Sequence, residues 1–79
     1  MKVQVLGSGC SKCQLTARQV REVAQTLGVQ IELEKVQDPA AIVAMGVIGT
    51  PAIAIGGKVV HAGGVPSRER IEALLRAAA

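Results

Sequence analysis

The chain contains no Phe, Tyr or Trp, although 49% of its 79 residues are hydrophobic. Its core must therefore be built from the short side chains of Val, Ile, Leu and Ala, which have to pack closely to fill the interior. A chain of this length buries about 60% of its unfolded surface and supports one compact core. We therefore expect residues 1–79 to form a single domain that acts at its surface on a partner, without a large internal cavity.

Charge and hydrophobicity argue against two kinds of partner. The net charge is +3, and the nine Lys and Arg residues are scattered among six acidic residues. With neither a basic run nor an aromatic side chain to stack on bases, the chain is not expected to bind nucleic acid. No segment approaches the ~18 apolar residues of a membrane span, and the N-terminal apolar stretch is too short for a signal peptide. We therefore expect a soluble, cytoplasmic protein with no membrane partner.

Glycines and helix-capping residues divide the chain into alternating elements. A β-rich run ends at Gly7, and an amphipathic run with small or apolar residues every three or four positions ends at Gly28. Asp38 followed by Pro39, and later Ser67, are suitable N-caps for two further helices. The expected elements are strand 3–6, helix 13–27, strand 29–34, helix 40–45, strands 52–55 and 59–62 around a glycine turn, and helix 68–78. This βαβαββα order predicts an α/β fold with a four-stranded mixed sheet flanked by three helices.

Both cysteines of the chain stand between the first strand and the first helix, in the motif Cys10-Ser11-Lys12-Cys13. In a first helical turn their Cβ atoms would lie about 5–6 Å apart on one face, close enough for a disulfide after a small adjustment. Cys10 is favoured as a thiolate by the positive end of the helix and by Lys12, whereas Cys13 belongs to the buried stripe. A disulfide closing so small a loop would stabilise little, which favours redox or metal chemistry over a structural role.

Metal binding is the principal alternative for this motif. Copper-chaperone domains also place Cys-x-x-Cys between a first strand and a first helix, but they carry a Met where this chain has Ser8, and their order is βαββαβ. A tetrahedral zinc site needs about four ligands, and beyond the two cysteines the chain offers one imidazole, His61. A zinc site would require two copies of the chain to share ligands, so no metal is expected and His61 is predicted to lie on a strand surface or at an interface.

A second specific feature is Gly49-Thr50-Pro51, directly before a β-rich run. A proline that enters a strand gives up a backbone donor, so it sits at a strand start or turn, where a trans bond is the commoner form and a cis bond is possible. The Cys motif after the first strand, with Thr50-Pro51 before the hairpin, resembles the thioredoxin fold, especially its small glutaredoxin-like redox-active disulfide proteins of bacteria and archaea. The similarity covers nearly the whole chain, including segments 5–10, 46–52, 56–60 and 64–67.

The resemblance implies a role for each matching residue. Cys10 would be the exposed nucleophile and Cys13 the resolving thiol. Pro51 would be a cis-proline beside the pair, and Thr50 would offer backbone hydrogen bonds to an extended substrate segment. The other residues expected to bind substrate are Ser11, Lys12, Gly63 and Gly64. The two glycines would form the third side of a shallow groove, a role that is compatible with a plain turn before the last helix.

Three positions depart from thioredoxin proper. Gly9 stands where a Trp is usual, Ser11-Lys12 replaces Gly-Pro, and Gln4 replaces a buried carboxylate. Proton transfer at Cys13 would then need water or an inward-facing glutamate from segment 29–34, although solvent-facing charge is the ordinary role of a strand glutamate.

These inferences predict a dithiol-disulfide oxidoreductase that exchanges the Cys10/Cys13 pair with protein disulfides. Its partners would be a disulfide-containing protein substrate and an upstream thiol reductase, it would need no cofactor beyond the redox-active disulfide, and it would be a monomer. The alternatives left open are a zinc- or copper-binding module and a glutathione-dependent glutaredoxin.

Overall fold

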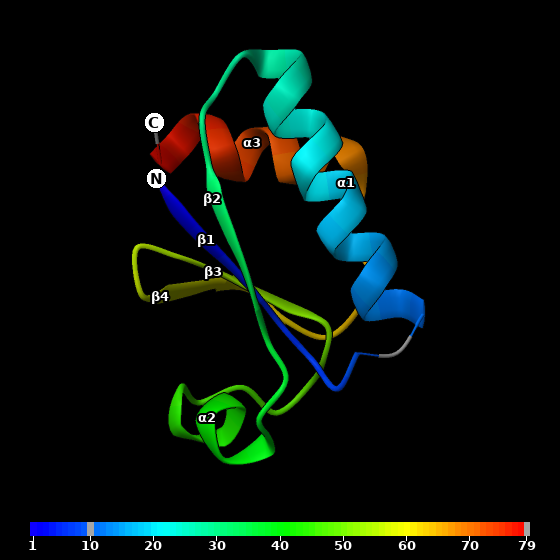
Figure 1. The fold of residues 1–79 in the computed structure, drawn as a ribbon, viewed down its shortest axis with the longest axis vertical. Coiled ribbons are helices and arrows are strands. Elements are labelled where there is room, and N and C mark those ends of the chain that lie inside the picture. Colours follow the sequence, from blue (N-terminus) through cyan, green and yellow to red (C-terminus); the bar gives the residue numbers. More distant parts are fainter. Residues whose placement is uncertain (10, 79) are drawn as a thin grey trace.

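Helices lie on both faces of a four-stranded mixed sheet in the computed structural model, which describes residues 1–9 and 11–78 (Figure 1). The predicted βαβαββα order is confirmed. In chain order the elements are β1 (Lys2–Leu6), α1 (Ser11–Leu27), β2 (Glu32–Val36), α2 (Pro39–Ala44), β3 (Ala52–Ile55), β4 (Lys58–His61) and α3 (Arg68–Ala78). Helices α1 and α3 cover one face and α2 lies against the other (Figure 1).

The strands are ordered β2-β1-β3-β4. Strands β1 and β2 are parallel, as the helical crossover between them requires, whereas β3 pairs antiparallel with both β1 and β4. The turn between β3 and β4 consists of Gly56 and Gly57 with φ angles of 60° and 83°. Two successive residues with positive φ are characteristic of the type I′ hairpin turn, whose twist matches that of the flanking strands.

The start of β2 differs from the prediction. The alternating pattern predicted a strand from residue 29, but β2 begins at Glu32. The reason is the end of α1: Gly28 has a φ of 72°, its N–H donates to the carbonyl of Gln25, and the N–H of Val29 donates to the carbonyl of Ala24. These two bonds form a Schellman motif that holds Val29 against the helix end and delays the strand. The other predicted bounds agree to within one or two residues.

Both predicted N-caps are confirmed. The N–H of Ala40 donates to Asp38 Oδ1 at 3.2 Å, and the N–H of Arg70 donates to Ser67 Oγ at 3.1 Å. Each bond satisfies a backbone donor that has no partner within its own helix. Among the described residues, no helix is long and apolar enough to cross a membrane.

The core has two parts, one on each face of the sheet, and both consist of small aliphatic side chains. Under α1 and α3, the buried residues are Val3, Val20, Val23, Ala24, Ile53, Ile71 and Leu75. Under α2, they are Leu6, Ile42, Val47, Ala52 and Ala54. The core without aromatic residues is thus divided into two aliphatic clusters, one on each face of the sheet.

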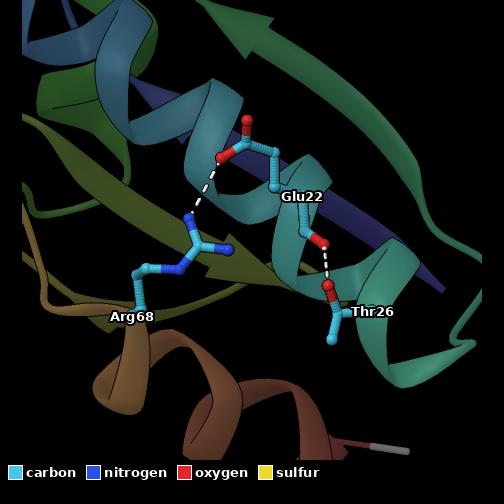
Figure 2. Close-up of polar contacts among 3 residues, drawn as sticks. All are labelled: Glu22, Thr26 and Arg68. Atoms are coloured by element: carbon cyan, nitrogen blue, oxygen red, sulfur yellow. Dashed lines mark hydrogen bonds and ion pairs between the residues drawn. The ribbon is translucent and has the colours of Figure 1, made fainter.

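A polar contact joins α1 to α3 at the surface (Figure 2). Arg68 Nη1 donates to Glu22 Oε1 at 3.0 Å, and Thr26 Oγ1 donates to the backbone carbonyl of Glu22 at 3.0 Å. Both charged side chains of this pair are about half exposed. An exposed ion pair of this kind contributes about 0–1 kcal/mol, so the docking of α3 depends mainly on its buried Ile71 and Leu75.

Candidate active site

The turn between β1 and α1 places the second cysteine of the motif. The N–H of Gly7 donates to the carbonyl of Val36 at 2.9 Å, which extends the parallel pairing one residue past β1. Gly9 then takes a φ of 84°, and its carbonyl accepts a hydrogen bond from Gln14 Nε2 at 3.0 Å. Helix α1 begins at Ser11, so Cys13 lies in its first turn.

Cys13 is 5% exposed, which confirms its predicted place on the buried side of α1. Its sulfur lies directly against Gly7, where an added Cβ would overlap it. Ser11 and Lys12, between the cysteines, are both exposed. Cys10, the predicted nucleophile, lies outside the described residues. The motif therefore presents two polar side chains to solvent and keeps its second sulfur inside.

The loop before β3 lies beside this turn. The Thr50–Pro51 bond is cis, the form implied by the resemblance, and Pro51 is buried whereas Thr50 is exposed. The position of a Cβ on Gly7 is 3.8 Å from the Cβ of Thr50 and also meets the sulfur of Cys13. Cys13 and Thr50, which are far apart in the sequence, thus both lie against the same side of Gly7.

Gly63 and Gly64 complete the arrangement on the other side of this loop. The N–H of Gly63 donates to the carbonyl of Gly49 at 3.2 Å, and the N–H of Gly64 donates to the carbonyl of Pro51 at 3.4 Å. The two glycines have φ angles of 89° and 144°, which other residues rarely adopt. The structure therefore brings together the predicted residues of segments 50–51 and 63–64, and Thr50 of this group lies near Gly7, which contacts Cys13.

Three residues have a role at the site that the sequence analysis did not assign to them. Gly7 and Gly49 are needed for space, because a Cβ would meet the Cys13 sulfur in one case and lie 3.0 Å from the α-carbon of Gly63 in the other. The third is His61, whose Nε2 lies 2.9 Å from the carbonyl oxygen of Gly64. The available signal was their position in the sequence: Gly49 belongs to the motif with Thr50 and Pro51, Gly7 lies three residues before Cys10, and His61 lies two residues before Gly63.

A cavity of about 10 Å³, enough for roughly one water molecule, adjoins Cys13. Its other lining residues are Val5, Gly7, Gly9, Gln14, Lys35 and Gln37. Among the residues that the structure describes, none that lines this cavity carries a carboxylate. The small volume excludes a substrate side chain, so a partner would have to meet the site from its surface.

The possibility of an inward-facing glutamate on the second strand is not realised. Glu32 and Glu34 are both exposed. Glu34 accepts a hydrogen bond from Gln4 Nε2 at 2.8 Å and pairs with Lys2 Nζ at 3.4 Å. The hydrogen bond from Gln4 and, next, the charge of Lys2 lower the pKa of Glu34. Gln4, at the position of the missing carboxylate, thus serves a surface network away from the Cys13 cavity.

Within residues 1–9 and 11–78, no group of three or more His, Cys, Asp and Glu side chains could hold a metal ion. His61, the imidazole considered as a ligand, is half-buried with its Nε2 against the Gly64 carbonyl. In this structure the Nε2 atom of His61 therefore contacts the backbone and does not point to a metal site.

The arrangement of sheet, helices and cis-proline loop matches solved thioredoxins. Thioredoxin-2, a component of the malaria parasite protein secretion machinery, superposes with a TM-score of 0.70 over 96% of this chain and 81% of that protein, at 18% identity. Thioredoxin 1 from Thermosipho africanus TCF52B superposes with a TM-score of 0.60 over 98% of this chain and 93% of that protein, at 19% identity. The fold is therefore the thioredoxin fold, as the resemblance implied.

Comparison of the sequence with known proteins identifies the family. Residues 1–76 match the model of a thioredoxin domain family. The thioredoxin of Methanothermobacter thermautotrophicus is 35% identical over 75 residues, which cover 95% of this chain and 97% of that relative. The thioredoxin of Methanocaldococcus jannaschii is 35% identical over 74 residues, covering 94% and 85%. The chain belongs to the thioredoxin family and is a thioredoxin-type redox protein.

Proposed function

We propose that this protein is a dithiol-disulfide oxidoreductase that acts on protein disulfides, with Cys10 as the nucleophile and Cys13 as the resolving thiol. One observation carries the proposal: the buried Cys13 sulfur and the Cβ of Thr50, next to the cis-Pro51 bond, both lie on the side of Gly7 where a Cβ would project. A substrate segment lying along Thr50 would therefore pass next to the cysteine motif.

The exchange has two steps. The Cys10 thiolate attacks one sulfur of the substrate disulfide, a Cys10–substrate disulfide forms, and the other substrate sulfur leaves as a thiolate and takes up a proton. Cys13 gives up its proton and attacks the Cys10 sulfur, the Cys10–Cys13 disulfide forms, and the second substrate sulfur leaves and is protonated. The substrate gains two electrons and two protons. The protein supplies both electrons and the Cys13 proton, and the second proton comes from solvent, into which the Cys10 thiol released it on ionising. An upstream thiol reductase returns the pair to the dithiol.

The place of Cys10 in the sequence and the burial of Cys13 support unequal roles. Residue 10 comes directly before the first residue of α1, and we expect the unpaired N–H groups of a helix start and the charge of Lys12 to favour a thiolate there. Cys13, at 5% exposure, is inaccessible to a folded substrate and reacts with the Cys10 sulfur once that sulfur is joined to the substrate. Ser11, Lys12, Gly63 and Gly64 would flank the bound segment. We extend the proposal to a monomer working in the reducing cytoplasm.

Insulin reduction driven by dithiothreitol tests the proposal. The wild type is expected to accelerate precipitation of the insulin B chain, whereas Cys10→Ser should be no faster than dithiothreitol alone. Gln25→Ala is the control, because it changes an exposed side chain of α1 outside the residues assigned to the site and keeps both sulfurs. Equal rates of insulin reduction for the wild type and Cys10→Ser would contradict the catalytic role of Cys10.

The resolving role has its own test. Cys13→Ser should complete the first step and then stop, so a mixed disulfide between Cys10 and the substrate accumulates and runs as a larger species on a non-reducing gel. The wild type should show little of it. Stoichiometric zinc or copper in anaerobically purified protein that does not reduce insulin would instead support a metal-binding module and contradict the proposal.

A further inference from the structure

His61 connects the end of β4 to the turn that flanks the substrate loop. It is the last residue of β4 and pairs with Ile53 of β3, so its backbone is held by the sheet. Its Nε2 lies 2.9 Å from the carbonyl oxygen of Gly64. A carbonyl oxygen only accepts, so Nε2 must carry the proton, which the imidazolium and one of the two neutral tautomers supply.

Gly64 is thereby held from two directions. Its carbonyl accepts from His61, and its N–H donates to the carbonyl of Pro51 at 3.4 Å, a long bond. The neighbouring Gly63 N–H donates to the carbonyl of Gly49 at 3.2 Å. Both glycines have positive φ, so the turn has little intrinsic conformational preference and depends on such bonds for its position.

We propose that His61 is a positioning residue for substrate: by donating to the Gly64 carbonyl it fixes the distance between the Gly63–Gly64 turn and the Thr50–Pro51 loop, and so the width of the surface that receives the extended substrate segment. The inference rests on the proposed function. It assigns His61 no contact with the reacting sulfurs, so the loss of the bond should weaken the binding of a peptide segment and leave the thiol chemistry intact.

The test compares His61→Leu, which removes the donor, with His61→Gln, whose amide nitrogen reaches about as far as the ring Nε2. Lys58→Gln, at the exposed start of β4, is the control. We expect His61→Leu to raise the KM for insulin about three- to tenfold, because the variant loses one hydrogen bond. Its kcat and its rate with hydroxyethyl disulfide, which carries no peptide segment, should match the wild type, and His61→Gln should restore the KM. An unchanged KM, no rescue by Gln, or a parallel loss with the small disulfide would overturn the inference.

Amide exchange measured by NMR separates this inference from the proposed function, because it needs no activity. The Gly63 and Gly64 amides should exchange faster in His61→Leu than in the wild type or His61→Gln. If His61→Leu does not fold, His61→Asn serves instead, since its shorter side chain falls short of the Gly64 carbonyl. Unchanged exchange contradicts the positioning role whether or not the protein reduces insulin. Inactive wild-type protein with the expected exchange pattern would contradict the proposed function alone.

Discussion

The α-carbon of Gly7 lies against the buried sulfur of Cys13, and a Cβ at residue 7 would overlap that sulfur. The constraint is spatial, because Gly7 is not among the glycines with positive φ. Gly7→Ala must therefore push the sulfur away, and overpacking of this kind costs about 1–3 kcal/mol. We expect a lower free energy of unfolding in urea and slower insulin reduction, because the displaced sulfur is misplaced for the second step.

A double-mutant cycle isolates the contact between Gly7 and Cys13. Cys13→Ala removes the sulfur and leaves the Cβ, so Gly7→Ala should cost less stability in that background than in the wild type. The same cost in both backgrounds would mean that the Gly7 effect does not pass through the sulfur.

A second steric prediction concerns the contact between the two loops. A Cβ at Gly49 would lie 3.0 Å from the α-carbon of Gly63, which is backbone and cannot rotate aside. Gly49→Ala is therefore expected to cost about 1–3 kcal/mol in urea unfolding and to raise the KM for insulin, since the loops must separate. Ile48→Ala is the control for stability, because Ile48 is fully exposed and its truncation should change stability by less than about 0.5 kcal/mol. Gly49→Ala as stable as Ile48→Ala would contradict the argument.

The elements that the sequence predicted well are those determined by neighbouring residues. Asp38 and Ser67 cap the helices that follow them, and Gly28 ends α1. The predicted start of β2 was wrong. The alternating apolar pattern begins at Val29, whereas the strand begins only where the chain leaves the helix cap and pairs with β1. That choice depends on tertiary register, which the local pattern does not contain.

For the site, too, the sequence predicted the features that depend on neighbouring residues or on the family resemblance, and it did not predict the contacts between distant segments. The burial of Cys13 followed from the helical period, and the cis bond before Pro51 from the resemblance. The contact of Gly7 with Cys13 and that of His61 with Gly64 depend on how strands and loops meet in space. The sequence also does not distinguish a glycine that is required because a Cβ would clash from one that is required for a positive φ. The structure shows that Gly7 is of the first kind and Gly28 of the second.

The docking of α3 is predicted to depend on its core side chains and little on its surface ion pair. Leu75 is 1% exposed, and its truncation to Ala should cost about 2–5 kcal/mol. Arg68→Met removes the half-exposed bond to Glu22 and should cost less than about 1 kcal/mol. Urea unfolding of the two variants at one salt concentration makes the comparison. A larger loss in Arg68→Met would show that the ion pair dominates.

Glu34 should make the stability of the protein depend on pH. The Gln4 hydrogen bond, followed by the charge of Lys2, holds the pKa of Glu34 below its ordinary value. Because the folded pKa is the lower one, the stabilisation is fully present above the unfolded pKa and is lost as the pH falls through the folded pKa. The stability difference between wild type and Glu34→Gln should therefore be present at neutral pH and disappear in acid.

NMR titration of the Glu34 carboxyl carbon measures how much Gln4 and Lys2 each lower the pKa of Glu34. Gln4→Ala and Lys2→Met are each expected to raise the pKa of Glu34, because the Gln4 hydrogen bond is the largest single cause and Lys2 contributes both its charge and a hydrogen bond. High salt should also raise the pKa in the wild type, since the Debye length falls to about 3 Å at 1 M, and it should have less effect once Lys2 is replaced. If Gln4→Ala leaves the titration of Glu34 unchanged, the surface network does not control this carboxylate, and the pH dependence must come from other groups.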